Sequence, residues 1–294
     1  MTALLALVLL QQVAVNPAAP QPDPYEHQVQ TWRQAREQSL KADDGWLTVT
    51  GLAWLSPGRN TFGAAPGSTV RLPAHASPAA GAFVLDGAHV IVEVAPGVPV
   101  TRAGQPVTRA ELRSDAGGQE PDVLALGAVT MQVLSRGARL AVRIRDLRTP
   151  ARAAFKGLRW YPVKPEYLVQ ARFLPAATPR TMRVDSVIGI PDDMSSPGTV
   201  EFQLGGKTLH LTPVIEPGDP SLFFIFRDAT AGKTTYGAGR FLHADPPRDG
   251  VVILDFNRAY TPPCGFTAYA TCPLPPAENR LTLPIEAGEL TPPH

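Results

Sequence analysis

The sequence has few of the residues that mark a specialised class of protein. It contains two cysteines among 294 residues, and its aromatic and charged shares are 7% and 18%. Lys and Arg total 27 against 26 Asp and Glu, a net charge of +1, which excludes both a polybasic nucleic-acid binder and a highly acidic protein. From this charge balance we expect no nucleic-acid partner. No run of 18 apolar residues occurs, so we also expect no stable membrane span.

The usual catalytic motifs are also missing. The sequence has no HExxH and no GxSxG, and its six histidines are scattered, so it indicates neither a zinc protease nor a serine hydrolase of the common type. The segment TAGKTT at residues 230–235 resembles the end of a phosphate-binding loop, but Arg227 occupies the position of the first glycine. We therefore expect no cofactor and no metal site.

Proline, by contrast, is abundant. The chain has 32 prolines, roughly twice the average share of about 5%, together with 25 glycines. Both residues work against long helices, so the composition predicts a loop-rich, mainly β protein. A hydrophobic share of 44% over this length is enough for one large core or two modest ones.

The chain begins with two short segments of different character. Residues 1–20 resemble a secretory signal, because residues 3–10 form an apolar run too short to span a membrane. This segment predicts export to the periplasm or the extracellular medium. Residues 21–45 predict a helix, with Asp23 as N-cap, Pro24 at the first helical position and Glu26 completing a capping box.

Residues 46–135 predict the first β half. Short extended runs follow one another at the spacing of a sandwich or barrel, and Asp86-Gly87 marks a hairpin between two of them. Within this half LSPGRNTFG, VRLP, VTRAGQPV and LALGAVTMQV faintly resemble the strand order of a forkhead-associated β-sandwich. The arginine that follows the first glycine in such phosphopeptide binders is replaced by Ala64-Ala65, so phosphothreonine recognition is not implied.

Residues 136–294 predict a second, β-rich half without a flexible linker before it. Gly205-Gly206 marks another hairpin. Residues 136–183 carry ten Arg and two Lys against Asp146 and Glu166, a local net charge of +10. In RLAVRIR at residues 139–145 arginines alternate with apolar residues, which predicts guanidinium groups on one outer face of a strand. That face is either solvated and paired with acidic neighbours, or an anion site.

The most distinctive segment is DFNRAYTPPCGFTAYATCPLPPAENRL at residues 255–281. Together with DGWLTVTGLAWL, PGRNTFG, RDATAGKTTYGAGRFL and IEAGE, it resembles the bacterial and archaeal family of domains of unknown function numbered 1684. The resemblance extends over about residues 32–289. It implies no particular reaction or ligand.

Cys264 and Cys272 lie in this Pro/Cys-rich loop, and four interpretations compete for them. The interpretations are a disulfide, a pair of buried structural thiols, a nucleophile at Cys264, and two ligands of a metal site that needs further ligands. Eight residues of separation and prolines near both cysteines suit a disulfide, and free thiols are a liability in an oxidising compartment. We therefore predict that the two cysteines are joined.

Polar residues around this loop predict a cleft. The arginine excess of residues 136–183 and the missing catalytic motifs lead us to expect a small anionic ligand, bound at the arginine-rich face or in this cleft, since loops on a rigid β scaffold commonly carry function. One alternative is a hydrolase with Cys264 as nucleophile and Asp255 or Asn257 orienting its partner, and another is an accessory protein with a disulfide-closed loop. The predicted cleft comprises Asp228, Tyr236, Arg240, Asp255, Asn257, Tyr260 and Cys264, with Arg145 as the anion partner.

Overall fold

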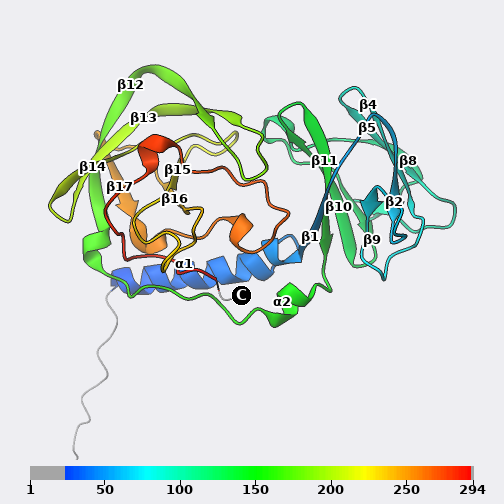
Figure 1. The fold of residues 1–294 in the computed structure, drawn as a ribbon, viewed down its shortest axis with the longest axis horizontal. Helices are drawn as coiled ribbons and strands as arrows, with labels where there is room; N and C mark the ends of the chain where they lie inside the picture. Colours follow the sequence, from blue (N-terminus) through cyan, green and yellow to red (C-terminus); the bar gives the residue numbers. More distant parts are fainter. Residues whose placement is uncertain (1–23, 293–294) are drawn as a thin grey trace, which may run out of the picture.

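The computed structural model describes residues 24–292 and shows a mainly β protein with one long helix near its N-terminus (Figure 1). The two β halves lie side by side, and the helix runs along the lower edge of the C-terminal half in this view. The signal-like residues 1–20 and the predicted N-cap Asp23 lie outside the described residues. None of the helices within residues 24–292 is long and apolar enough to cross a membrane.

Helix α1 (Pro24–Lys41) forms as predicted, with Glu26 in its first turn. It belongs in space to the C-terminal half, which lies more than 100 residues further along the chain. The buried guanidinium of Arg33 donates to the carbonyls of Tyr161 at 3.1 Å and Asn257 at 3.4 Å. Polar contacts of its side chains therefore attach the helix to the second half, together with the edge-on contact of Trp32 with Trp160 at 5.7 Å.

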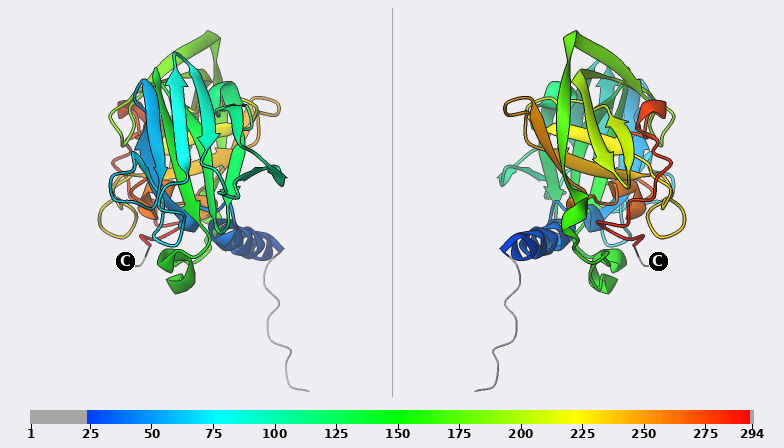
Figure 2. Two further views of the ribbon diagram at one scale, coloured as in Figure 1. Left: turned by 90° about the vertical axis from the view of Figure 1, so that its right-hand side faces the viewer. Right: turned by 90° about the vertical axis from the view of Figure 1, so that its left-hand side faces the viewer.

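The N-terminal half contains two sheets, as expected for a sandwich. One has the order β1-β11-β10-β9-β6-β7 and the other β3-β2-β4-β5-β8 (Figure 2). The predicted hairpin at Asp86 is β4–β5, although Asp86 pairs with His89 and the turn is one residue later. The strands are β1 (Val49–Trp54), β2 (Gly58–Gly63), β3 (Val70–Arg71), β4 (Gly81–Asp86), β5 (His89–Val94), β6 (Thr101–Arg102), β7 (Gln105–Pro106), β8 (Arg109–Leu112), β9 (Val123–Leu126), β10 (Val129–Arg136) and β11 (Arg139–Asp146).

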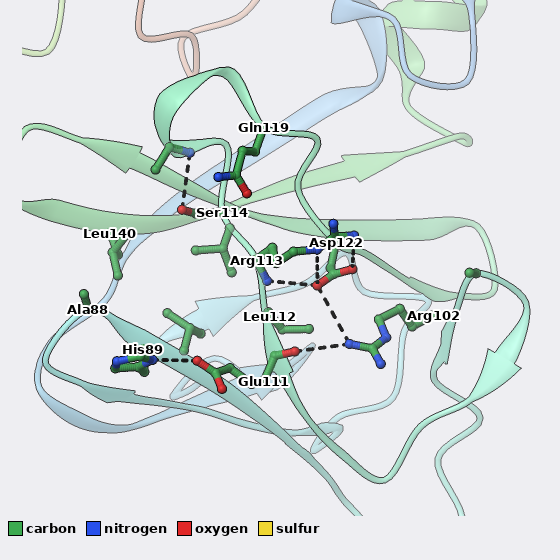
Figure 3. A pocket seen from close by; sticks show the side chains of 14 residues that line it. Ala88, His89, Arg102, Glu111, Leu112, Arg113, Ser114, Gln119, Asp122 and Leu140 are labelled. Carbon is green, nitrogen blue, oxygen red and sulfur yellow. Dashed lines mark hydrogen bonds and ion pairs between the residues drawn. The ribbon is translucent and has the colours of Figure 1, made fainter.

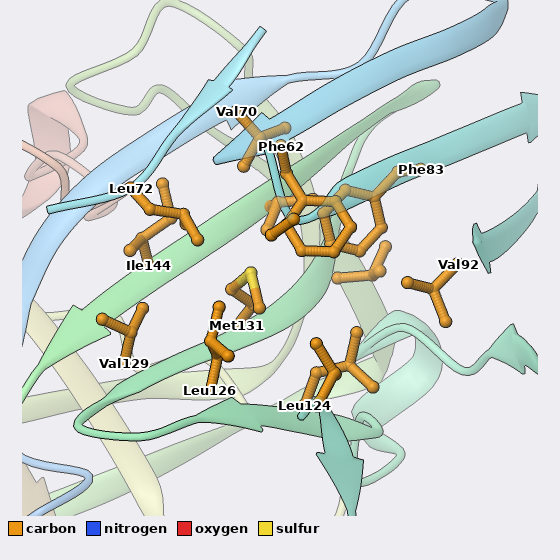
Figure 4. Packing of buried hydrophobic residues seen from close by; sticks show 14 of the residues in the cluster. Phe62, Val70, Leu72, Phe83, Val92, Leu124, Leu126, Val129, Met131 and Ile144 are labelled. Atoms are coloured by element: carbon orange, nitrogen blue, oxygen red, sulfur yellow. The ribbon is translucent and has the colours of Figure 1, made fainter. Parts of the chain in front are cut away.

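The core of this half lies between the two sheets. Phe62 and Phe83 of one sheet pack with their ring centroids 4.9 Å apart and face Met131 and Ile144 of the other (Figure 4). Alternate residues of β10 and β11 enter this core, while Ala141 and Arg143 on the other face of β11 are also buried, so β11 is covered on both faces.

The C-terminal half combines a four-stranded sheet, β14-β13-β12-β17, with the two-stranded β15-β16. The predicted Gly205-Gly206 hairpin joins β13 and β14, and both glycines have positive φ, at 56° and 72°. The strands are β12 (Leu168–Val184), β13 (Asp192–Leu204), β14 (Lys207–Leu211), β15 (Leu222–Phe226), β16 (Arg240–Ala244) and β17 (Val251–Asp255). Short helical turns are η1 (Trp46–Thr48), η2 (Ala116–Gly118), α2 (Pro150–Ala154), η3 (Pro165–Tyr167), η4 (Phe256–Arg258), η5 (Pro263–Gly265) and η6 (Ala277–Asn279).

Strand β15 lies between two hydrophobic clusters, which explains its uninterrupted apolar sequence LFFIF. Phe224 and Phe226 enter the cluster that is shared with β12, β13 and β17. Phe223 and Ile225 point to the opposite face and enter a second cluster, which we call the loop cluster and which also contains Cys272 and Ala270. A strand buried on both faces loses the polar alternation of a surface strand.

The predicted boundary at residue 136 falls inside the hairpin of β10 and β11. Strand β11 pairs with β1 on one side and β10 on the other, as the second strand from the edge of the six-stranded N-terminal sheet. The chain leaves this half only after Asp146. The predicted boundary coincides with the start of the basic residues 136–183, and that start lies in the middle of the hairpin. A change in charge along the sequence therefore did not mark the end of the N-terminal half.

A buried ion pair joins β15, β16 and the C-terminal segment. Arg240 Nη2 lies 2.6 Å from Asp228 Oδ2, and both side chains are 1% exposed. Arg240 also donates to the carbonyls of Ile285 and Ala287. Asp228 accepts from the amide of Thr230 at 2.8 Å and from the amide of Ile285 at 3.2 Å. One pair therefore fixes the turn after β15 and the last residues of the core.

Removing either member of this pair leaves a buried charge without its partner. We expect Asp228→Ala and Arg240→Met each to lower the free energy of unfolding by about 3–5 kcal/mol. The double variant is expected to lose less than the sum of the two, as measured by urea denaturation. As a control, Arg172→Met removes the surface pair with Glu201 and should leave the midpoint nearly unchanged. Additive losses in the double variant would show that the two side chains are not coupled.

Candidate functional site

The structure divides the predicted cleft among several places. The side chains of Asp228 and Arg240 are paired with each other in the buried ion pair, and both also form hydrogen bonds with backbone groups. Their side chains therefore hold the fold and do not face a ligand. Asp228 accepts from the amide of Thr230 in the turn after β15, and the sequence gave no sign that Arg240 is its partner.

Asp255 and Asn257 bind α1 to the C-terminal half. Tyr25 Oη donates to Asp255 Oδ1 at 2.7 Å, and Asn257 Nδ2 donates to Tyr25 Oη at 2.9 Å. Asn257 is fully buried and also exchanges hydrogen bonds with the backbone of Lys164. Burial, together with the Asp255 carboxylate, raises the pKa of Tyr25. The two residues predicted to orient a nucleophile are thus part of the helix attachment.

The predicted row of guanidinium groups on β11 exists, but only Arg139 is exposed, whereas Arg145 is half-buried and Arg143 is buried. Arg143 and Arg145 lie over the ring of Trp46, with 4.7 and 5.8 Å from each guanidinium carbon to the ring centroid. Arg145 Nη1 also donates to the carbonyl of Gly45 at 2.9 Å. Arg145 is therefore engaged at the contact between the halves and does not join the polar residues of the predicted cleft.

A groove of about 970 Å³ lies between α1 and the outer face of the C-terminal sheet, and we call it the α1 groove. Two of the predicted site residues, Asp255 and Tyr260, line it. Trp32 and Arg36 contribute from the helix, with the Arg36 guanidinium 4.5 Å above the ring centroid of Tyr260. The groove is therefore bordered by elements that are distant in the sequence.

One wall of the α1 groove is apolar. Leu168, Val251 and Ile253 are 40%, 38% and 47% exposed, although each sits in a strand. These side chains lie on neighbouring strands β12 and β17. Exposed apolar side chains gathered in a concave surface are typical of a binding site, whereas isolated ones need no explanation.

The opposite part of the groove carries a chain of polar groups around His243. His243 Nε2 lies 3.0 Å from Tyr260 Oη, and its Nδ1 lies 3.3 Å from Ser221 Oγ. The imidazole stacks nearly parallel on Phe223 and on Tyr260. The side chain of His243 is exposed towards the groove, and partial desolvation by the groups packed against its ring lowers its pKa and outweighs the opposing effect of Asp219, so the ring is neutral at pH 7.

Another pocket, of about 920 Å³, lies in the N-terminal half, but its charged groups satisfy one another (Figure 3). Arg113 lies 3.1 Å and Arg102 3.8 Å from Asp122, and His89 lies 2.6 Å from Glu111. Such internal pairing leaves little net charge for a ligand. This pocket is therefore a weaker candidate than the α1 groove.

The predicted disulfide is not formed in the structure. Cys264 and Cys272 are both free thiols, and the amide of Cys264 donates to Cys272 Sγ at 3.2 Å. Tyr236 Oη donates to the carbonyl of Cys264 at 2.9 Å. The stiff loop thus brings the cysteines together as the spacing suggested, while hydrogen bonds occupy the place of a covalent bond.

Sequence reasoning missed His243 and the apolar wall of the groove. The alternation in VVILD could have shown that Val251 and Ile253 share one face, yet nothing in it shows that this face is exposed. His243 lies within the otherwise buried strand β16, and its partners Ser221 and Tyr260 are 22 and 17 residues away. No local motif records such a combination.

The fold and the grooved C-terminal half define a mainly β protein with a helix attached across its second sheet. Residues 153–290 match the family described as a protein of unknown function (DUF1684), and the chain belongs to this family. The match includes the three C-terminal motifs, whereas DGWLTVTGLAWL and PGRNTFG lie outside it. No curated protein matches the chain.

Several solved structures are similar to parts of the chain. An uncharacterized protein from Haloarcula marismortui, solved by solution NMR, is 33% identical over 49% of this chain and 81% of its own, with a TM-score of 0.42. An FHA domain from a study of phosphothreonine-dependent interactions is 19% identical over 32% of this chain and 92% of its own, with a TM-score of 0.23. The FhaA FHA domain, solved in a complex, gives the same identity and TM-score over 97% of its own length.

The environment of His243 leads to a prediction about its titration. Because the groups packed against its ring partly desolvate the imidazolium, we expect its pKa to lie below 6.5, as measured by NMR of the ring protons. Its contribution to stability is then fully present above pH 6.5 and is lost as the pH falls through the lowered pKa. His89, which is exposed and whose pKa is raised by its hydrogen bond to Glu111, provides an internal control. A pKa of His243 above that of His89 would show that burial does not dominate its titration.

Proposed function

We propose that this protein binds a small organic anion with an apolar body, such as an aliphatic or aromatic carboxylate, in the α1 groove. The observation that carries the proposal is the combination of three exposed apolar side chains on one wall with Arg36 on another. Ligand sites are commonly concave, largely apolar and furnished with a few polar groups that fix orientation.

The apolar wall supplies the affinity for the body of the ligand. Covering Leu168, Val251 and Ile253 removes apolar surface from water, which contributes roughly 25 cal/mol for each Å² that is buried. Trp32 extends this surface from the helix side of the groove. A purely polar anion such as phosphate would gain nothing from these contacts, so the wall favours an amphipathic ligand.

Arg36 supplies the attraction for the acidic group. Its Nη2 donates to the carbonyl of Thr261 at 2.8 Å and its Nε lies 3.5 Å from Glu289. A guanidinium has five donors, so these contacts leave capacity for a carboxylate. Burial raises the pKa of Glu289, while Arg36 opposes this shift.

His243 and Tyr260 select the hydrogen-bonding pattern of the ligand. As a neutral imidazole paired with a hydroxyl at 3.0 Å, His243 contributes polarity without another positive charge. The site therefore suits a single negative charge better than a polyanion. Export of the protein remains part of this proposal, and it is supported by the signal-like residues 1–20.

Binding can be tested by isothermal titration calorimetry with octanoate and benzoate, and with octanol as an uncharged comparison. We expect the carboxylates to bind more tightly than octanol. Ile253→Asp should abolish carboxylate binding, because it places a negative charge on the apolar wall. Val123→Asp is the matched control, since Val123 is 43% exposed on a strand of the other half and should bind as the unaltered protein does.

A second variant separates the charge from the apolar wall. Arg36→Gln is expected to weaken the binding of octanoate about tenfold, a loss of about 1.4 kcal/mol, while leaving octanol unaffected. Arg59→Gln, which alters an exposed arginine of the N-terminal half, serves as the control. Equal losses for Ile253→Asp and Val123→Asp, or no binding of any of these probes, would refute the proposal.

A further inference from the structure

The two free thiols of the terminal loop differ in their surroundings. Cys264 is half-buried on η5, whereas Cys272 is 5% exposed among the apolar residues of the loop cluster. The backbone holds Cys272 in place, because its carbonyl accepts from the amide of Val187 at 3.0 Å. One thiol is thus accessible and the other is protected, although the two are in contact.

The contact between the thiols distributes their protons unevenly. The hydrogen bond from the Cys272 thiol lowers the pKa of Cys264 to about 7, and the Cys264 backbone and Tyr236 support the same direction. The same hydrogen bond, together with burial, raises the pKa of Cys272. The accessible sulfur is therefore the better nucleophile and the buried sulfur holds the proton.

A buried arginine, Arg143, lies over the ring of Trp46, which packs against the loop cluster, and two of its nitrogens lack hydrogen-bond partners among residues 24–292. Arg143 is 5% exposed, and its Nε and Nη2 have no hydrogen-bond partner among the described residues. Burial lowers the pKa of Arg143 to about 10, and the positive charges of Arg145 and Arg136 act in the same direction. With this pKa, Arg143 still carries a positive charge at neutral pH. That charge favours the thiolate form of Cys272. An unpaired buried cation is costly unless an anion forms beside it.

We propose that Cys264 and Cys272 are a redox-active dithiol that undergoes thiol–disulfide exchange, with Cys264 as the attacking thiol and Cys272 as the resolving thiol. The accessible thiol, the buried thiol in contact with it and the unpartnered Arg143 together carry this assignment. It is independent of ligand binding in the α1 groove.

The exchange takes place in two steps with a disulfide R–S–S–R as the oxidant. The Cys264 thiolate attacks one sulfur, the S–S bond of the oxidant breaks, and the leaving RS⁻ takes a proton from water. Cys272 then loses its proton and attacks the sulfur of Cys264, which breaks the mixed disulfide and releases the second RSH. Two thiols thereby pass two electrons and two protons to the oxidant, giving one internal disulfide and two RSH.

Arg143 acts in the second step as a positioning residue. Once the Cys264 sulfur is part of the mixed disulfide, it is no longer a thiolate that accepts a hydrogen bond from the Cys272 thiol. Cys272 must therefore lose its proton without help from Cys264. The guanidinium stabilises the thiolate that forms. Without it, the first step should proceed as before, and the mixed disulfide should persist.

The test equilibrates the full chain with mixtures of reduced and oxidised glutathione and follows the thiols by mass spectrometry after acid quenching. We expect the unaltered protein to shift between dithiol and internal disulfide within the range of these mixtures. Cys272→Ser should retain one glutathione on Cys264, and Cys264→Ser should form no adduct on the buried Cys272. Arg143→Met should accumulate the mixed disulfide at Cys264, with the second step slowed about threefold for each unit by which the pKa of Cys272 rises.

Arg139→Met is the matched control for Arg143, because Arg139 lies on the same strand but is exposed over Trp54. It should exchange at the rate of the unaltered protein, and urea denaturation of each variant separates loss of exchange from loss of folding. Three results would overturn the proposal. They are thiols that remain reduced in oxidised glutathione, a disulfide that only dithiothreitol reduces, and adducts that form on Cys272 in place of Cys264.

Discussion

The ion pair between Asp228 and Arg240 constrains more of the C-terminal half than any hydrophobic contact does. Its two side chains are buried, and their other hydrogen bonds reach the amides and carbonyls of residues 230, 285 and 287. These backbone groups belong to a turn and a terminal segment that have no strand partner to satisfy them. Because buried backbone groups must be hydrogen-bonded, the pair takes the role of a sheet ladder where the chain is irregular. The Pro-rich loop between Tyr260 and the terminal segment can then be long and still keep a fixed conformation.

Arginine has an unusual structural role in this chain. Arg33, Arg143 and Arg240 are all at most 5% exposed, and each lies over an aromatic ring at 4.8, 4.7 and 5.3 Å. A guanidinium is weakly hydrated and planar, so it tolerates such contacts better than an ammonium group does. The charge excess of residues 136–183 was therefore a poor guide to a solvent-facing anion site. Among these three, Arg143 has two buried nitrogens, Nε and Nη2, without a hydrogen-bond partner in residues 24–292, whereas Arg33 and Arg240 have one each.

The parts of the fold that depend on local patterns were predictable from the sequence. The helix start at Pro24, the hairpin at Gly205-Gly206 and the alternation along β11 all follow from backbone preferences within a few residues. The partners of these elements were not predictable, since α1 packs on a sheet that begins after residue 160 and β11 returns to pair with β1. The same limit applies to the site. The sequence named Tyr260 and Cys264, but the residues around them come from α1, β11 and β16.

Tyr260 connects the α1 groove with the terminal loop without making them one site. Its ring packs beneath Arg36 on the groove side and edge-on against Phe241, which belongs to the loop cluster with Cys272. The side chains on which ligand binding depends, Ile253 and Arg36, come from β17 and α1, whereas Cys264 and Cys272 come from the loop that follows Tyr260. Close packing can transmit a shift of the loop to the tyrosine ring, because a dense interior has few voids to absorb it. The apolar wall, however, is held by the pairing of β12 with β17, which does not involve the loop. The two chemistries are therefore neighbours in space that rest on different parts of the fold.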